Sequence, residues 1–133
     1  NNPDHVIIVD EAYVRFGGET AIPLVRKYPN ILVVQTMSKS HSLAGLRVGF
    51  AIGSPELIEG MYRVKDSFNS YPVDRIAQAG AIASLQNKRT VEANINTVRA
   101  TREGVSVALR MIGFDVLPSS ANFIMIHYWH CKA

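Results

Sequence analysis

The sequence predicts an α/β fold in which a mostly parallel sheet with one antiparallel strand is followed by a long helix and short strands. Residues 6–9 and 31–35 are continuous apolar runs separated by a helix-length segment, which is typical of a right-handed parallel βαβ unit. Residues 47–53 form a third run after a loop too short for a parallel crossover. We therefore expect this strand to be antiparallel to the second, or displaced from it.

The segment up to residue 53 is expected to contain the sheet and one short helix. Runs without polar alternation indicate strands buried on both faces, and residues 6–9 and 31–35 have this pattern. Between them, Thr20 is expected to cap a short helix that ends near Tyr28, with Pro23 tolerated in its first turn.

Two helices are predicted after the third strand. The first begins with a cap, a proline and an acidic residue at positions 54–56 and is expected to end near Lys65. The second covers residues 73–86, after a break at residues 67–72, and is rich in alanine and glycine. These small residues would allow close packing against a neighbour.

A long helix and two strands are predicted for the last part of the chain. The helix spans residues 88–112, and its apolar stripe is interrupted at Arg102. Gly113 is expected to end it. Residues 114–117 and 122–126 are predicted strands around a turn. Because the pattern changes here, we predict a domain boundary near residue 87, between residues 1–87 and residues 88–133.

Composition argues against several classes of function. The net charge is +3 over 133 residues, and the basic residues are scattered rather than clustered as on a nucleic-acid surface. No segment has the long uncharged apolar run of a membrane helix. The single cysteine, Cys131, rules out an internal disulfide and fits a reducing compartment, so we expect a cytoplasmic protein.

Lys39 follows the second predicted strand and lies among small and hydroxyl-bearing residues. Its amine can form a Schiff base with an aldehyde, and Ser38 and Thr36 supply hydroxyl groups beside it. Arg47 lies eight residues further on and can bind a phosphate through two parallel hydrogen bonds. The alternatives are an ordinary surface lysine and an arginine paired with an acidic side chain.

Asp10 and Glu11 follow the first predicted strand. Ligands of open α/β sheets bind at the carboxyl ends of strands, so we expect Asp10 and Lys39 at one edge of the sheet. Asp10 can hold a protonated pyridine nitrogen, and Tyr13 can donate to a phenolate oxygen. The alternatives are a cap or a solvated strand end for each carboxylate, accepted in part for Glu11, and a packed aromatic side chain for Tyr13.

A lysine, an aspartate, a tyrosine and a phosphate-binding arginine are the groups needed to hold pyridoxal 5′-phosphate. In this interpretation Lys39 tethers the aldehyde, Asp10 keeps the ring nitrogen protonated and Arg47 binds the phosphate. Lys39, once displaced by substrate, is then the natural base for moving a proton from the substrate Cα.

Three motifs also resemble the fold-type-I pyridoxal-phosphate aminotransferases, with histidinol-phosphate aminotransferases as the closest branch. They are Asp-Glu-Ala-Tyr at residues 10–13 with Phe16 nearby, Thr-Met-Ser-Lys at residues 36–39, and Ala-Gly-Leu-Arg-Val-Gly-Phe at residues 44–50. The resemblance covers residues 6–126. It implies Lys39 as the Schiff-base lysine, Asp10 at the pyridine nitrogen and Tyr13 at the ring oxygen. It further implies phosphate contacts from Ser38 and Arg47, with Thr36 as a weaker candidate.

The resemblance implies the central and C-terminal portion of such an enzyme. Residues 1–87 would be the C-terminal half of its three-layer, cofactor-binding large domain, and residues 88–133 a linking helix with part of a small α+β domain. The implied reaction is transamination between histidinol phosphate, or a related amino donor, and a 2-oxo acid such as 2-oxoglutarate, in a homodimer. The alternatives are another aminotransferase, such as one for aromatic amino acids, and a folded but catalytically incompetent fragment.

Three features depart from the family pattern. His41 stands where that branch has an aromatic or apolar residue, and we interpret it as an exposed loop histidine, with tuning of the pocket as the alternative. Asn69 and Tyr71 lie in a segment that differs from the expected Pro-Tyr-Asn, although either could still face the site. Members of the family are also much longer. His127, His130 and Cys131 are too weak a signal for a metal, and we predict no metal site.

Overall fold

The computed structural model describes residues 4–128 and contains a three-stranded sheet in the order β1-β2-β3. Strand β1 (Ile7–Asp10) is parallel to β2 (Ile31–Thr36), and β3 (Gly49–Ile52) is antiparallel to β2. This arrangement confirms the predicted parallel unit and the predicted reversal of the third strand. The short loop before β3 is the reason for that reversal, because a parallel strand would need a longer crossover.

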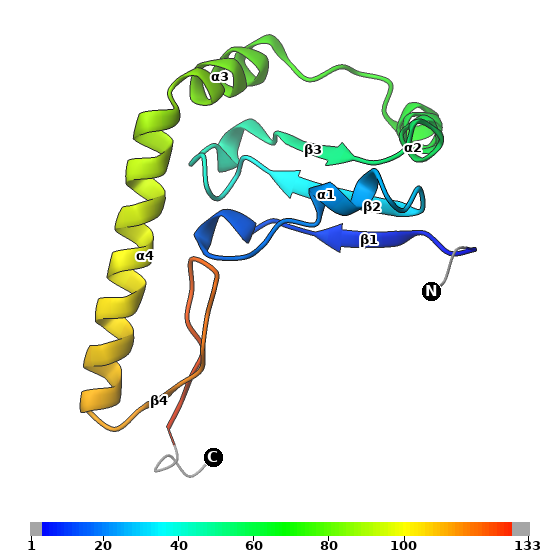
Figure 1. Ribbon diagram of the computed structural model, residues 1–133. Coiled ribbons are helices and arrows are strands. Elements are labelled where there is room, and N and C mark those ends of the chain that lie inside the picture. Colours follow the sequence, from blue (N-terminus) through cyan, green and yellow to red (C-terminus); the bar gives the residue numbers. More distant parts are fainter. Residues whose placement is uncertain (1–3, 129–133) are drawn as a thin grey trace.

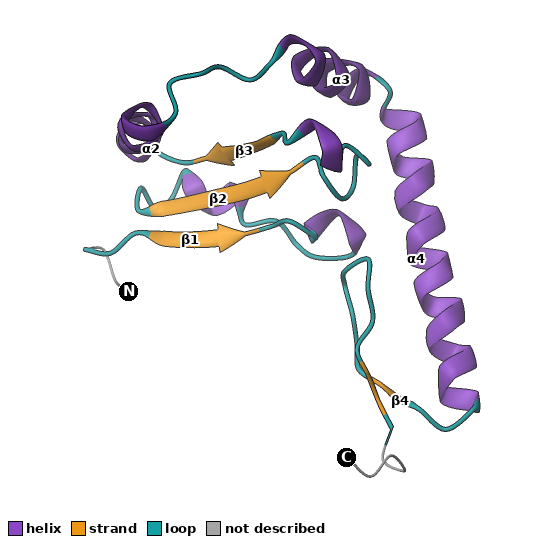
Figure 2. Ribbon diagram, turned by 180° about the vertical axis from the view of Figure 1, so that it is seen from behind, coloured by secondary structure: helices purple, strands orange, loops and turns teal. Residues whose placement is uncertain are grey.

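The strand directions bring three chain segments to one edge of the sheet. Since β1 and β2 are parallel, they end on the same side, at Asp10 and Thr36. The opposite direction of β3 makes it begin there, with Gly49 paired to Thr36. Figures 1 and 2 show helix α4 (Lys88–Met111) beside this edge and helix α2 (Pro55–Phe68) at the other end of the strands. Residues 10–16 and 36–49 are called the lysine edge below.

Burial on both faces was predicted for both parallel strands and is correct only for β2. Its first three residues, Ile31, Leu32 and Val33, are buried. In β1, by contrast, Ile8 is 65% exposed and Ile7 is 42% exposed. The reason is that β1 packs mainly against β2 within residues 4–128, so its two faces lack the helices that cover a buried parallel strand.

The short helix α1 (Ile22–Val25) is smaller than predicted, and its cap is different. Its N-cap residue is Ala21, not Thr20, and the helix ends before Tyr28. The Thr20 hydroxyl still accepts the Ile22 N–H at 3.2 Å. The carboxylate of Glu11 accepts the Ala21 N–H, so a residue from the end of β1 fixes the start of α1.

The next two helices begin at the predicted signals. Ser54 caps α2 by accepting the Leu57 N–H at 3.4 Å, and α2 continues three residues beyond the predicted end, to Phe68. Helix α3 (Arg75–Gln86) begins after Asp74, whose carboxylate accepts two backbone N–H groups. Each cap satisfies donors that a first helical turn leaves without partners.

The long helix α4 packs through its first half and exposes much of its second. Val91 and Ile95 form a buried core cluster with Phe16, which belongs to the 3-10 helix η1 (Val14–Phe16). Val105 and Ile112, which the predicted stripe also included, are 44% and 67% exposed. The predicted helix limits are confirmed to within one residue. The predicted division at residue 87 coincides with the break between α3 and α4 and stays a prediction.

The strands after α4 are shorter than predicted. Only β4 (Asp115–Val116) and β5 (Ile126–His127) pair, in an antiparallel ladder. Residues 122–125 were predicted to be strand but form a turn-rich loop. A side chain takes up backbone hydrogen-bonding groups there. Ser119 Oγ donates to the Phe123 carbonyl at 2.6 Å and accepts the Ala121 N–H at 3.1 Å. Gly113, at a φ of 95°, ends α4 as predicted.

Residues 4–128 contain neither a membrane-spanning helix nor a cluster of metal ligands. No helix within residues 4–128 combines the length and apolar character needed to cross a membrane. No cluster of three or more metal-ligating side chains occurs in that range either. Two of the three terminal residues weighed as metal ligands, His130 and Cys131, lie outside the described residues.

Candidate functional site

All six residues predicted to form the site lie on the lysine edge. Asp10 ends β1 and Thr36 ends β2. Ser38 and Lys39 follow in the loop before the 3-10 helix η2 (Ala44–Leu46), which Arg47 terminates. Tyr13 lies three residues after Asp10, at the start of η1. Strand direction therefore groups residues that are up to 37 positions apart in the sequence.

Lys39 and Tyr13, from two different segments of this edge, lie close together. The Lys39 Nζ atom lies 5.7 Å from the centre of the Tyr13 ring. An aromatic face attracts a cation at this distance, so the ring stabilises the ammonium group, which forms no ion pair within residues 4–128. Lys39 is exposed, which leaves its amine open to a small molecule.

Aromatic and aliphatic side chains pack against Tyr13 and restrict its movement. Its ring meets the Phe123 ring edge-on, with centroids 5.1 Å apart and an interplanar angle of 89°. It also packs against the cluster of Phe16, Val91 and Ile95. Edge-to-face contact is a favoured aromatic geometry, so Tyr13 is held on two sides. The alternative for Tyr13, a packed aromatic side chain, therefore describes its surroundings, and the packed ring still faces the Lys39 amine.

The adjacent carboxylates Asp10 and Glu11 have different environments. Asp10 is exposed, and its Oδ1 accepts the Ala12 N–H at 2.9 Å. This is the local contact of a turn-capping residue, and within residues 4–128 the carboxylate has no ion pair. Glu11 is 6% exposed, so the solvated strand end is wrong for it, and the cap is the alternative that the structure supports. It accepts Thr20 Oγ1 at 2.8 Å, Gln35 Nε2 at 2.7 Å and the Ala21 N–H.

Thr36 and Ser38 form a hydroxyl pair at the end of β2. Thr36 Oγ1 lies 2.9 Å from Ser38 Oγ and accepts the Ser38 N–H at 3.0 Å. The Val48 carbonyl, at 3.3 Å, is a second acceptor for the same hydroxyl. The pair is half-buried and closely linked, so it offers an incoming anion hydroxyl groups whose positions are already set.

Arg47 has a left-handed backbone conformation, with φ of 55° and ψ of 40°. A non-glycine residue in this region is strained, and such strain occurs often at binding sites. The side chain is exposed, and Nη1 donates to the Ala44 carbonyl at 3.0 Å. Arg47 pairs with no carboxylate in the part of the chain that the structure describes. The ion-pair alternative is therefore wrong within those residues.

His41 is half-buried, which corrects its interpretation as an exposed loop residue. Its Nδ1 lies 3.0 Å from Oγ of the buried Ser40. Burial lowers the pKa of His41, and the nearby Arg15 guanidinium lowers it further, against an opposing effect from Glu92. Arg15 and Glu92 form an ion pair between η1 and α4. The lysine loop, η1 and α4 therefore meet around His41.

The structure adds Phe123 and Arg102, which were not predicted as site residues. Phe123 was assigned to a strand, so no signal linked it to Tyr13. The sequence does show that Arg102 interrupts the apolar stripe of α4, and the structure explains why an arginine stands there. Arg102 lies on the packed side of α4 and donates to the carbonyls of Phe16 and Ala121. Asn69 and Tyr71 lie in the exposed connection between α2 and α3, where Asn69 Oδ1 accepts the Tyr71 N–H.

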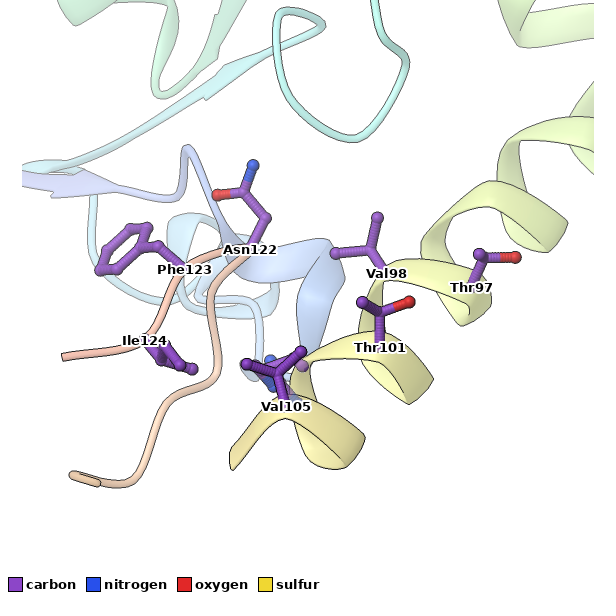
Figure 3. A pocket seen from close by; sticks show the side chains of 8 residues that line it. Thr97, Val98, Thr101, Val105, Asn122, Phe123 and Ile124 are labelled. Carbon is purple, nitrogen blue, oxygen red and sulfur yellow. The ribbon is translucent and has the colours of Figure 1, made fainter. Parts of the chain in front are cut away.

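A groove with a volume of about 280 Å³ lies between α4 and residues 122–124. Figure 3 shows Val98 and Val105 on the helix side, with Phe123 and Ile124 on the opposite segment. The groove is mainly apolar. Phe123 lines the groove and also contacts Tyr13, so it is shared by the groove and the lysine edge.

The groups on the lysine edge match the chemistry of pyridoxal 5′-phosphate. An aldehyde requires an amine, supplied by the exposed Lys39. A pyridine nitrogen requires a carboxylate, supplied by the exposed Asp10. A phosphate requires cations and hydroxyl groups, supplied by Arg47 and the Thr36–Ser38 pair. Asp10 and Arg47 make no hydrogen bond or ion pair with the other four residues in the described structure, so these two could bind a ligand without breaking such a contact.

Comparison with known proteins gives a family match over almost the whole chain. The model of the family described as aminotransferase class I and II matches residues 1–131. The histidinol-phosphate aminotransferase of Aromatoleum aromaticum is 60% identical over 132 residues, which is 99% of this chain and 37% of that protein. That of Gluconacetobacter diazotrophicus is 57% identical over 95% of this chain and 35% of its own length. The chain thus spans little more than a third of these relatives.

Solved structures agree with the fold. The histidinol-phosphate aminotransferase of Sinorhizobium meliloti, in complex with pyridoxal 5′-phosphate, superposes with a TM-score of 0.80 and 25% identity, covering 91% of this chain and 33% of that chain. The aspartate aminotransferase of Thermus thermophilus with maleate gives a TM-score of 0.76 and 25% identity, covering 92% of this chain and 34% of that one. These likenesses confirm the predicted fold class.

Proposed function

Because the chain belongs to the class I and II aminotransferase family, we propose that it provides the lysine and part of the cofactor site for pyridoxal-phosphate-dependent transamination. The proposed amino donor is histidinol phosphate, which the names of the relatives suggest, and the acceptor is a 2-oxo acid such as 2-oxoglutarate. The observation that carries the proposal is the grouping of an exposed amine, an aromatic face and an exposed carboxylate on the lysine edge.

Lys39 is the proposed catalytic residue. Pyridoxal phosphate, when bound, supplies a conjugated ring that accepts the electron pair of a broken Cα–H bond. Lys39 would hold the aldehyde carbon through Nζ before substrate arrives. Its released amine would then remove the proton from the substrate Cα and deliver it to the cofactor carbon. The exposed position and flexible stem of Lys39 suit both tasks.

Asp10 and Tyr13 would control the ring. A carboxylate beside a pyridine nitrogen favours its protonated form, and Asp10 is oriented for this by the Ala12 N–H. The Tyr13 hydroxyl would donate to the ring oxygen, while packing against Phe123 restricts its movement. Thr36, Ser38 and Arg47 would bind the phosphate through hydroxyl groups and a guanidinium.

The test is covalent capture by borohydride. The chain is incubated with pyridoxal phosphate and reduced with sodium borohydride, and the modified lysine is identified by peptide mass spectrometry. We expect saturable modification of Lys39. Lys27 is a matched control, because its Nζ also lies over a tyrosine ring, that of Tyr28 at 5.3 Å, without the other groups of the site. The proposal would be contradicted if Lys39 were not labelled in a saturable way. It would also be contradicted if the total saturable labelling of the chain were the same in Lys39→Ala.

A panel of amino donors then tests the substrate. A protein that contains this segment and transaminates should convert histidinol phosphate with a higher kcat/KM than aromatic amino acids. Preference for an aromatic donor would favour the alternative aminotransferase. Labelling of Lys39 without turnover would favour a chain that binds cofactor but is catalytically incompetent by itself. Homodimer formation and a cytoplasmic location are part of the same proposal, supported by many exposed large apolar side chains and by the single cysteine, respectively.

A further inference from the structure

Two arginines of α4 bind consecutive backbone carbonyls of η1. Arg99 Nη2 donates to the Arg15 carbonyl at 2.7 Å, and Arg102 Nη1 donates to the Phe16 carbonyl at 3.0 Å. The bonds join residues 84 and 86 positions apart in the sequence. They hold the loop that carries Tyr13 against α4, in addition to the apolar contacts of Phe16.

Arg102 differs from Arg99 because it also binds a third segment. The same Nη1 atom donates to the Ala121 carbonyl at 2.7 Å, so both of its N–H groups are used. Nε and Nη2 lie 3.1 and 3.0 Å from Glu103 Oε1. The Arg102 side chain is 12% exposed. A planar guanidinium fixed at both ends holds η1 and residues 119–123 at a set distance from each other.

The segment held by Arg102 carries Phe123. Ala121 is two residues before Phe123, and Ser119 closes the turn between them through the Phe123 carbonyl. The Phe123 ring contacts Tyr13, whose ring faces the Lys39 amine. A continuous series of contacts therefore leads from Arg102, through Phe123 and Tyr13, to Lys39.

We propose that Arg102 is a positioning residue for Lys39, acting through the Phe123 and Tyr13 rings to hold an aromatic face against the amine. The catalytic meaning of this role rests on the proposed function, in which Lys39 carries the cofactor. The positioning role itself concerns only where the Tyr13 ring lies relative to the Lys39 amine, so it can be tested without cofactor. Without Arg102, the hydrogen bonds that join the 119–123 turn to η1 are lost, so Phe123 is held less firmly and the ring of Tyr13 can move away from the amine.

The test measures the environment of Lys39 without any cofactor. Lysines are reductively methylated with isotope-labelled formaldehyde, which keeps their positive charge, and the methyl resonances are followed by NMR. Methyl groups over a ring face are shifted upfield. We expect upfield resonances for Lys39 and, as an internal reference, for Lys27 over Tyr28. Loss of one resonance in Lys39→Arg assigns it.

Arg102→Met should remove the upfield shift of Lys39 and leave that of Lys27 unchanged. Arg102→Lys should retain part of it, because one ammonium can reach one carbonyl but cannot bridge both in the same way. Arg110→Met is the matched control, since Arg110 Nη2 binds the Val116 carbonyl at 3.1 Å without touching η1. It should leave both shifts unchanged.

Phe123→Leu keeps the proposal testable if Arg102→Met fails to fold. Phe123 is 56% exposed, so its replacement should be tolerated, and it should remove the Lys39 shift by breaking the series one step later. A Lys39 shift that persists in folded Arg102→Met or in Phe123→Leu overturns the proposal. Loss of the Lys27 shift as well would indicate general unfolding and likewise refute a specific role. Failure of borohydride capture, by contrast, refutes the proposed function and leaves this result unaffected.

Discussion

The lysine edge and the α2–α3 segment (residues 54–87) are held in different ways. The lysine edge combines exposed polar groups with buried anchors, among them Phe16 at 2% exposure, Glu11 at 6% and Ser40 at 6%. The α2–α3 segment has helices with good caps but little core. Helix α2 has no buried residue, and in α3 only Ala77 is buried. Phe68 and Ile76 are 78% and 75% exposed.

This difference shows that helix formation and tertiary burial are separate requirements. Ser54 and Asp74 satisfy the first-turn donors of their helices, so local signals suffice to define α2 and α3. Burial on the lysine edge instead depends on residues distant in sequence, such as Phe16 with Val91 and Ile95. Mutations should therefore affect the stability of the two regions unequally, even when the amino-acid change is the same.

The largest contrast is expected between Phe16→Ala and Phe68→Ala. Removing the buried Phe16 ring leaves a cavity against Val91 and Ile95, which should lower the free energy of unfolding by about 3–5 kcal/mol. Removing the exposed Phe68 ring should change it by less than about 0.5 kcal/mol. Urea unfolding of the two variants measures both values.

Each variant is the control for the other, because both lose the same atoms. Similar losses of stability would mean that Phe68 is buried in solution, for example by self-association. Repeating the measurement over a range of protein concentrations separates that case, since a stability that depends on association rises with concentration.

A smaller contrast is expected within the lysine edge, between Glu11→Gln and Asp10→Asn. The Glu11 carboxylate accepts three donors, and an amide would turn a donor toward one of them. The resulting mismatch in a buried site should cost about 1–3 kcal/mol. Asp10 is exposed and accepts one backbone N–H, so its replacement should cost less than about 0.5 kcal/mol.

Cofactor capture should show the reverse order. Asp10→Asn removes the carboxylate proposed to face the pyridine nitrogen, so borohydride labelling of Lys39 should need more pyridoxal phosphate. Glu11→Gln should leave labelling unchanged under conditions where the variant is folded. Equal effects of both variants on stability and on labelling would remove the distinction between the structural and the binding carboxylate.

The sequence was sufficient where local chemistry and strand direction decide the structure. The run at residues 31–35, the short loop before Gly49 and the cap at Ser54 each predicted an element that the structure contains. The grouping of Asp10 with the lysine loop followed from parallel strands alone. The roles assigned to the six site residues stay predictions.

The sequence was insufficient where one side chain serves a distant segment. A cap was among the alternatives for Glu11, but the sequence could not identify the groups that it binds, because its donors lie 9 to 24 residues away. Residues 122–125 have the apolar pattern of a strand, but the Phe123 carbonyl, which a strand would use for pairing, accepts the Ser119 hydroxyl. Arg102 binds the Ala121 carbonyl directly before this segment. The exposure of Ile8 was also missed, since the pattern of a buried strand does not tell how many neighbours it has.

The smallest expected effect is a pH dependence of stability that arises from His41. Its pKa is lowered from 6.5 in the folded chain, chiefly by burial and then by Arg15, so the unfolded chain binds the proton more readily. Stability from this residue is therefore present above about pH 6.5 and is lost as the pH falls below it. Urea unfolding at several pH values between neutral and mildly acidic should show this decline.

His41→Asn separates this effect from other titrations, because the amide can keep a hydrogen bond to Ser40 and takes up no proton in this range. The variant should lose less stability than the original chain over the same fall in pH. The Arg15–Glu92 ion pair makes a further comparison possible. Glu92→Gln removes the carboxylate that opposes the shift, so it should lower the pKa of His41 further and steepen the decline. If both variants followed the original curve, His41 would not sense the junction between the lysine edge and α4. The lysine edge would then differ from the α2–α3 segment by its packing alone.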